Sequence, residues 1–241
     1  MLKSNFYKIL YCVIFLNVTV TFGQISEGKI IFERKTNLFK KFTNEDTQEY
    51  IQSKNKYKTD IFELYFNDSM SLFIPGEDLP NDNLNWTVEK NTVIQNFNQQ
   101  TSRSILYLWG TPFLIKDSIH KREWKFTDKQ RTICKIECMQ AVCQIDDSTR
   151  IYAWFTSSIT PNIGPESYCN LPGAILGLAL EDGEVTYFAT SVNEQKIDFE
   201  LVTPRFNDKK SKTRREFIEK ARKDFKHEKD IEKYLKAIFL W

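Results

Sequence analysis

Short segments in which every second residue is strongly apolar follow one another along most of this chain. In residues 62–66 the apolar positions are Phe62, Leu64 and Phe66, and Asn67-Asp68-Ser69 then has the composition of a turn. Side chains of a strand alternate between the two faces of a sheet, so this pattern predicts strands with one buried face. Because the segments lie close together with no helical pattern between them, we expect a mainly β fold, an antiparallel curved sheet or open barrel-like structure.

Turn-forming residues mark where many of these strands end. Asp182-Gly183 is typical of a two-residue hairpin and separates an expected strand at residues 175–180 from one at residues 185–191. Residues 24–206 are therefore expected to form one antiparallel β domain. Its other strands are expected at residues 29–34, 72–74, 92–97, 105–109, 124–126, 132–138, 141–145, 151–155 and 197–201.

The pattern changes after Phe206. Residues 207–212 form a polar, basic linker, and Thr213 and Glu216 have the spacing of a helix capping box. Apolar residues then recur three or four positions apart, which predicts an amphipathic helix with a break near His227. Basic and acidic residues are mixed in this segment, so a solvated helix face is favoured over membrane-surface binding. Its apolar end can dock either on the sheet or on a partner.

The N-terminus has the pattern of a secretory signal peptide at residues 1–23. Lys3 and Lys8 form a basic region, residues 9–20 form an apolar core, and cleavage is expected near Gly23-Gln24. The apolar core is shorter than the ~20 residues that cross a bilayer, and no second long apolar run follows it. Loss of both lysines takes the formal net charge from +2 to 0. We expect a charge-balanced protein of the periplasm, cell envelope or exterior, without a transmembrane helix.

Export also bears on the cysteines that remain after Cys12 is removed. An even number in an oxidising compartment predicts two disulfides, with free buried thiols as the alternative. In one regular strand Cys134 and Cys138 would lie about 13 Å apart, beyond the Cα separation of about 7 Å that a disulfide can bridge, so we expect them not to pair with each other. The spacing contains no C-x-x-C, so neither a metal nor another cofactor is expected. The four cysteines are Cys134, Cys138, Cys143 and Cys169, for which we favour Cys138–Cys169 with Cys134–Cys143.

Recognised catalytic motifs are missing from the sequence. The two histidines are His120, beside Lys121-Arg122, and His227, in the charged C-terminal segment. Neither has a motif partner, and no H-E-x-x-H, G-x-S-x-G or P-loop pattern occurs. A cysteine paired with His120 would be the best available nucleophile. We assign no catalytic residue and expect the protein to be non-enzymatic.

Residues 124–191 carry a set of short motifs in a defined order, namely residues 124–129, 132–141 and 151–156, then Gly164-Pro165 and Leu171-Pro172-Gly173. This order resembles that of the GLPGLI family of secreted Bacteroidota proteins, whose name peptide corresponds to residues 170–175 here. Asn170 and Ala174 replace the family's first Gly and second Leu. The family has no established biochemical function, so the resemblance implies secretion and leaves activity, ligand and catalytic residues unassigned. The signature positions are Trp154, Gly164, Pro165, Leu171, Pro172 and Gly173.

The end of the signature also has a structural interpretation. Pro172 fixes φ and Gly173 permits positive φ, so Leu171-Pro172-Gly173 is expected to form a tight turn against the Trp154 strand. We favour this structural turn over the lip of a binding site, since a Pro-Gly dipeptide ordinarily marks a turn.

Three functions are compatible with these observations. The leading hypothesis is an exported binding or carrier module that holds an apolar small molecule or an envelope protein on the apolar face of the sheet. The second is an exported hydrolase or cysteine-dependent redox enzyme with an unrecognised site. The third is a structural or assembly partner in an envelope complex. Nucleic acid is not expected as a partner because export removes the chain from it, and the oligomeric state is left open.

Overall fold

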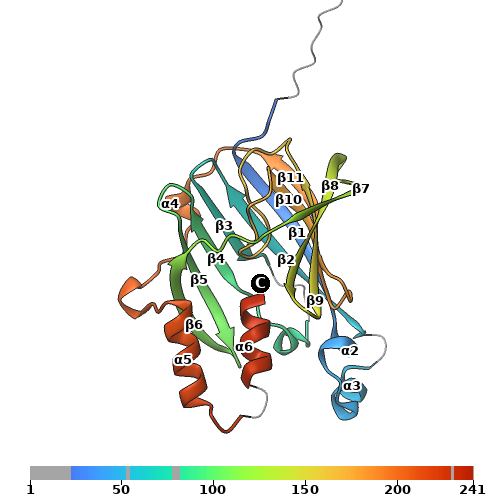
Figure 1. Ribbon diagram of the computed structural model, residues 1–241, viewed down its shortest axis with the longest axis vertical. Helices are drawn as coiled ribbons and strands as arrows, with labels where there is room; N and C mark the ends of the chain where they lie inside the picture. The colour runs from blue at the N-terminus through green and yellow to red at the C-terminus, as the bar shows by residue number, and fades with distance from the viewer. Residues whose placement is uncertain (1–22, 53–54, 78–81, 229–230, 241) are drawn as a thin grey trace, which may run out of the picture.

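A single antiparallel sheet dominates the computed structural model (Figure 1). The structure describes residues 23–52, 55–77, 82–228 and 231–240, so the predicted signal peptide lies outside the described residues apart from Gly23. Eleven strands follow the order β6-β5-β4-β3-β2-β1-β11-β10-β9-β8-β7. The sheet is not closed, which confirms the predicted mainly β, antiparallel, open architecture. Among the described residues, no helix is both long enough and apolar enough to cross a membrane.

The chain builds the sheet as two meanders that meet in the middle. The first runs from β1 outward to β6, and the second runs from the edge strand β7 back to β11, which pairs with β1. The strands are β1 (Gly28–Asn37), β2 (Tyr57–Phe66), β3 (Met70–Pro75), β4 (Thr92–Asn96), β5 (Thr101–Leu108), β6 (Thr111–Ser118), β7 (Lys125–Ile133), β8 (Ile136–Asp146), β9 (Thr149–Thr156), β10 (Ala174–Leu180) and β11 (Val185–Glu194).

Two hairpin turns lie at or next to segments that we expected to be single strands. Residues 132–138 turn at Cys134 and Lys135, whose φ values are 51° and 65°, so β7 and β8 pair on either side. Positive φ at both central residues is typical of a type I′ turn, which usually contains Asn or Gly. Trp109 and Gly110, with φ of 49° and 74°, turn the chain between β5 and β6 in the same way.

The helices are partly as predicted. The capping box of Thr213 and Glu216 is present and begins α5 (Arg214–Asp224), and after a turn α6 (Ile231–Leu240) follows. The strand predicted at residues 197–201 is wrong. That segment contains the short helix α4 (Phe199–Val202), which Asp198 caps by accepting a hydrogen bond from the Glu200 N–H. Within the described residues, the other short helices were not predicted: α2 (Leu38–Lys41), α3 (Glu45–Ile51), η3 (Asn85–Thr87) and η4 (Asp208–Lys210).

Two parts of the chain cover one face of the sheet. The signature loop, residues 157–173, inserts apolar side chains into the main core, which includes Phe32, Phe62 and Phe73. The helices α5 and α6 pack on β5 and β6, where Phe217 of α5 and Leu235 of α6 join a second apolar cluster (Figure 1). The C-terminal helices therefore dock on the sheet of their own chain, which was one of the two alternatives left open by the sequence.

Candidate functional site

The connection between β6 and β7 crosses the covered face and is bound to the signature loop. We call this connection, residues 119–124, the strap (Figure 1). The Asn170 amide donates a hydrogen bond of 3.1 Å to the Arg122 carbonyl, and the Trp124 indole donates one of 3.0 Å to the Cys169 carbonyl. The Cys169 thiol lies 3.9 Å from the His120 carbonyl oxygen. Residues of the signature loop thus hold the strap in place.

The Leu171-Pro172-Gly173 turn is confirmed. Gly173 has a φ of 118°, and its N–H donates to the Leu171 carbonyl at 2.8 Å and to the Asn162 side chain at 3.2 Å. The next residue pairs with Thr156, at the end of the Trp154 strand. A Cβ on Gly173 would lie 2.0 Å from the Thr156 carbonyl oxygen, so only glycine fits this turn. These contacts support the structural interpretation.

The other signature positions are buried or partly buried. Gly164 and Pro165 are buried in the signature loop, where the Pro165 carbonyl accepts a hydrogen bond of 3.1 Å from the Tyr168 N–H. Trp154 packs against the Phe188 ring, with centroids 5.5 Å apart. These positions shape the fold around the strap, and none of the three lines the cavity described next.

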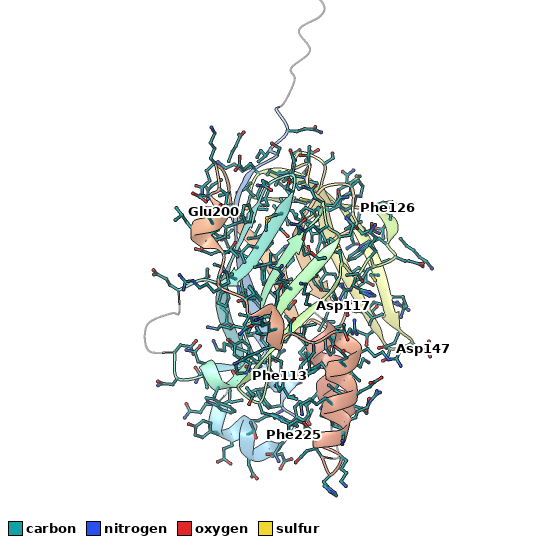
Figure 2. The ribbon with its side chains drawn as sticks, turned by 90° about the vertical axis from the view of Figure 1, so that its left-hand side faces the viewer. Phe113, Asp117, Phe126, Asp147, Glu200 and Phe225 are labelled. Carbon is teal, nitrogen blue, oxygen red and sulfur yellow. The ribbon has the colours of Figure 1, made fainter. Side chains whose placement is uncertain are left out.

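A cavity of about 220 Å³ lies where the strap, the sheet and the C-terminal helices meet, and we call it the strap cavity. Figure 2 shows Asp117 of β6, one of its lining residues, beside these helices. One part of its wall is apolar and comes from β4, β5, β6 and α6: Val93, Leu106, Ile115, Ile238 and Phe239. The other part is polar and includes Ser102, Ser104, Asp117, His120, Lys121, Arg122, Ser167 and Arg214.

Two arginines give the polar part of the strap cavity its character. Arg122 is only 7% exposed; its guanidinium stacks 3.7 Å from the Tyr168 ring centroid, and its Nη2 donates to the Leu240 carbonyl at 3.0 Å. The Arg214 guanidinium lies over the Phe239 ring. Burial, and then the positive charges of Arg122 and Arg214, hold the pKa of His120 below its usual value. An uncharged imidazole therefore faces this cavity at neutral pH.

A buried ionic network, which sequence reasoning missed, lies elsewhere on the same face. The Asp60 carboxylate accepts hydrogen bonds from Arg34 Nη2 at 2.8 Å and Lys58 Nζ at 2.5 Å, and Lys90 Nζ lies 3.1 Å away. Burial opposes ionisation of Asp60, but the adjacent cations outweigh it and its pKa is lowered. The Lys58 ammonium also contacts Asp82 at 2.6 Å. The network ties β1 and β2 to the loop before β4.

Glu166 joins the signature loop to this network. Its side chain accepts hydrogen bonds from the Tyr187 hydroxyl at 2.7 Å and from the Asn91 amide at 3.3 Å. Burial raises the pKa of the Glu166 carboxyl, while Tyr187 and the charge of Arg34 act in the opposite direction. Glu166 therefore has a packing role within the fold and is not available at the surface.

The four cysteines do not form disulfides. Cys134, Cys138, Cys143 and Cys169 are all free thiols, so the predicted pairs Cys138–Cys169 and Cys134–Cys143 are absent. The hairpin turn moves Cys134 to the tip between β7 and β8, where its thiol contacts the Ala189 carbonyl at 3.2 Å. Cys169 instead contacts the strap. Within the described part of the chain, no group of three or more His, Cys, Asp or Glu side chains is arranged to hold a metal ion.

Thiol counting checks this correction. Alkylation of the unfolded, unreduced protein, followed by mass spectrometry, is expected to add four groups to the chain that lacks the predicted signal peptide, one for each free cysteine. In the folded protein the reaction should be slow, because burial raises the pKa of all four thiols, that of Cys138 to about 11. Unfolded protein that takes up no alkyl group would contradict the structure and restore the two-disulfide prediction.

The molecule is thus an open-sheet β protein in which the signature loop fixes a strap over one face. A family model described as "Protein of unknown function (Porph_ging)" matches residues 129–177, from within β7 to within β10. The model describes the GLPGLI family associated with Bacteroidota, so the match confirms the resemblance to that family over these residues. A search of the curated proteins finds no match.

Similarity to the solved structures of PNGF-II supports the fold alone. Two structures of PNGF-II, in different crystal forms, align with 76% of this chain at TM-scores of 0.50 and 0.52 and sequence identities of 16% and 17%. The aligned part covers 31% and 30% of PNGF-II, so this chain spans less than a third of that protein. An uncharacterised conserved protein from Thermus thermophilus aligns with 76% of this chain and 88% of its own, at a TM-score of 0.39 and 7% identity.

Proposed function

We propose that this protein is an exported, non-enzymatic binding module of the periplasm or cell envelope, with its ligand in the strap cavity. The observation that carries the proposal is the placement of this cavity. It lies where the sheet, the strap and α6 meet, and it combines an apolar wall with several convergent polar side chains. Such a combination is typical of small-molecule sites.

The packing of the sheet moves the ligand away from the position that we first expected. The apolar face near β1 and β2 is filled by the signature loop, whose Ile159, Ile163 and Tyr168 are fully buried in the core. The strap cavity, at about 220 Å³, is smaller than the about 300–1,000 Å³ typical of ligand sites. A small ligand with a short apolar body and a polar end fits this cavity better than a long lipid.

The rival enzyme hypothesis is weakened by the environment of Cys169, which contacts the strap at His120. Cys169 contacts the His120 backbone carbonyl, and burial raises the pKa of its thiol. A nucleophilic cysteine needs the reverse, a thiolate stabilised by a neighbouring base or positive charge. The geometry therefore brings these two residues together without making a nucleophile.

One exposed surface favours the assembly hypothesis as the second candidate. Tyr50 is 71% exposed and Trp86 is 55% exposed, and their ring centroids lie 6.1 Å apart. Phe42 packs on the same tryptophan at 5.9 Å. Exposed aromatic groups of this kind are enriched at protein interfaces. The apolar face of α5 and α6 packs on β5 and β6 of the same chain, so it is not available to bind a partner protein.

A cavity-filling substitution tests the proposal. Native mass spectrometry of the protein purified from its own host should show a bound small molecule, and Ser104→Leu should abolish it by filling the cavity. Thr101→Leu is the control, because it lies on the same strand but lines a depression on the other face. Thermal melts check that both variants fold. A ligand retained equally by both variants would contradict the site, whereas a bound protein lost on Trp86→Ala would favour the assembly hypothesis.

A further inference from the structure

We infer that the strap cavity holds an anionic group, a carboxylate or a phosphate, on Arg122 and Arg214. This inference rests on the proposed function and adds the chemical class of the ligand. Its starting point is the charge of the polar wall, where Lys121, Arg122 and Arg214 face a single carboxylate, that of Asp117. The wall therefore has an excess of positive charge, although residues 24–241 as a whole are charge-balanced.

Arg122 carries the strongest evidence. Its Nη1 is buried and makes no hydrogen bond to any described part of the chain, whereas its Nη2 is held by the Leu240 carbonyl. The Tyr168 ring fixes the plane of the guanidinium from one side. A buried N–H donor without an acceptor is costly, because it has lost its hydrogen bond to water without forming another. An anion in the cavity supplies the missing acceptor at a donor that is already oriented.

Arg214 faces the same space from the first turn of α5. No carboxylate among the described residues lies within ion-pair distance of either arginine, and the positive charge of both lowers the pKa of the neighbouring His120. Burial and then the charge of Arg122 lower the pKa of Arg214 itself. The charge of the nearby Asp117 acts in the opposite direction on Arg214. Its two oxygens, however, accept hydrogen bonds from the backbone N–H groups of Arg214 and Ser118, at 3.1 and 2.8 Å, and from neither guanidinium.

The rest of the wall suits the same ligand. Ser102 and Ser104 of β5 offer hydroxyl donors, and two arginines within one cavity match the several oxygens of a carboxylate or phosphate. The apolar residues of the opposite wall, among them Leu106 and Phe239, receive a short hydrocarbon body. The structure thus fits a small amphiphilic anion, with its charged end toward the strap.

Calorimetry with matched probes tests this assignment on the protein without its signal peptide. Hexanoate and hexyl phosphate carry the charge on the same apolar chain, and hexanol lacks it. We expect one or both anions to bind, and the tighter of the two identifies the headgroup. Arg214→Gln should weaken that binding about 10- to 100-fold, as expected for a lost charge-assisted hydrogen bond. Arg215→Gln is the control, because this neighbour is paired with Glu219 on the exposed side of α5 and should leave binding unchanged.

His120 provides a second readout, which a general loss of stability would not change. An anion beside Arg122 and Arg214 offsets their charge, so binding should raise the pKa of His120 toward its ordinary value in an NMR titration. Equal affinity for hexanol and hexanoate, unchanged in Arg214→Gln, would overturn the anion assignment and leave the proposed cavity intact. Equal weakening by both arginine variants would overturn the assignment to Arg214. Absence of binding by every probe, together with an empty cavity in native mass spectrometry, would overturn both proposals.

Discussion

Asp60→Asn is expected to lower the free energy of unfolding by about 3–5 kcal/mol, the usual cost of breaking a buried ion pair from one side. The Asp60 side chain is 1% exposed and contacts Arg34, Lys58 and Lys90 within 3.1 Å. Removing its charge leaves these three cations close together, although Lys58 keeps its contact with Asp82. Urea denaturation, followed by circular dichroism, measures the loss.

The acid sensitivity of the protein should change in the same variant. Because the folded pKa of Asp60 is lowered, its stabilising effect is present above the unfolded value near pH 4 and is lost as the pH falls through the folded pKa. Asp60→Asn should therefore show less loss of stability on acidification than the natural protein. Glu63→Gln is the control on the other face of β2, where a partly buried pair with Lys29 contributes about 0.2–1 kcal/mol. An equal effect of both substitutions would contradict the importance of the buried network.

Gly173→Val is expected to destabilise the fold by about 2–5 kcal/mol. The left-handed backbone costs a side chain about 1–2 kcal/mol, and overpacking adds about 1–3 kcal/mol. The φ of 118° and the distance of 2.0 Å from an added Cβ to the Thr156 carbonyl oxygen make both effects act at once. The turn would have to move away from β9 to relieve the contact. Differential scanning calorimetry of the variant is the measurement.

Gly183→Val separates these two effects. Gly183 also has positive φ, 71°, but a Cβ added there meets nothing within 4 Å. Gly183→Val should be destabilised only by the unfavourable backbone conformation, so its melting temperature should lie between those of the natural protein and Gly173→Val. If Gly173→Val kept the natural melting temperature and lost a ligand, the turn would be the lip of a binding site and the structural interpretation would be wrong.

The alternation of apolar residues predicts most of the sheet because burial on one face repeats every second residue. It fails where backbone conformation is set by something other than burial. Cys134 and Lys135 adopt positive φ without the Gly or Asn that usually announces a hairpin, so the sequence there reads as one strand. At residues 197–201 the apolar residues alternate as in a strand, but Asp198 caps a four-residue helix. A segment this short cannot distinguish the strand period of two residues from the helix period of 3.6.

The candidate site was less accessible to sequence reasoning because its members come from distant parts of the chain. The strap cavity combines Ser104, Arg122, Arg214 and Phe239, and no local spacing connects them.

The buried network did leave a signal in the sequence. Arg34 follows Ile30 and Phe32 in the buried register of β1, and Asp60 occupies the same register as Phe62 in β2. A charged residue at such a position indicates a buried ion pair, and the cross-strand register of β1 and β2 places these two opposite each other.

The strap also sets a limit on the shape of the whole sheet. Laid flat, eleven strands would place the outermost pair, β6 and β7, about 48 Å apart at about 4.8 Å per step. The chain from Ser118 to Lys125 reaches at most about 25 Å when fully extended. The strap is therefore shorter than the width of a flat sheet, so the sheet must curve to bring β6 and β7 within its reach. It cannot flatten while both edge strands stay paired. Curvature in this protein is enforced by a covalent tether, so lengthening that tether with a flexible insertion would free the two halves of the sheet to open like a hinge about β1 and β11.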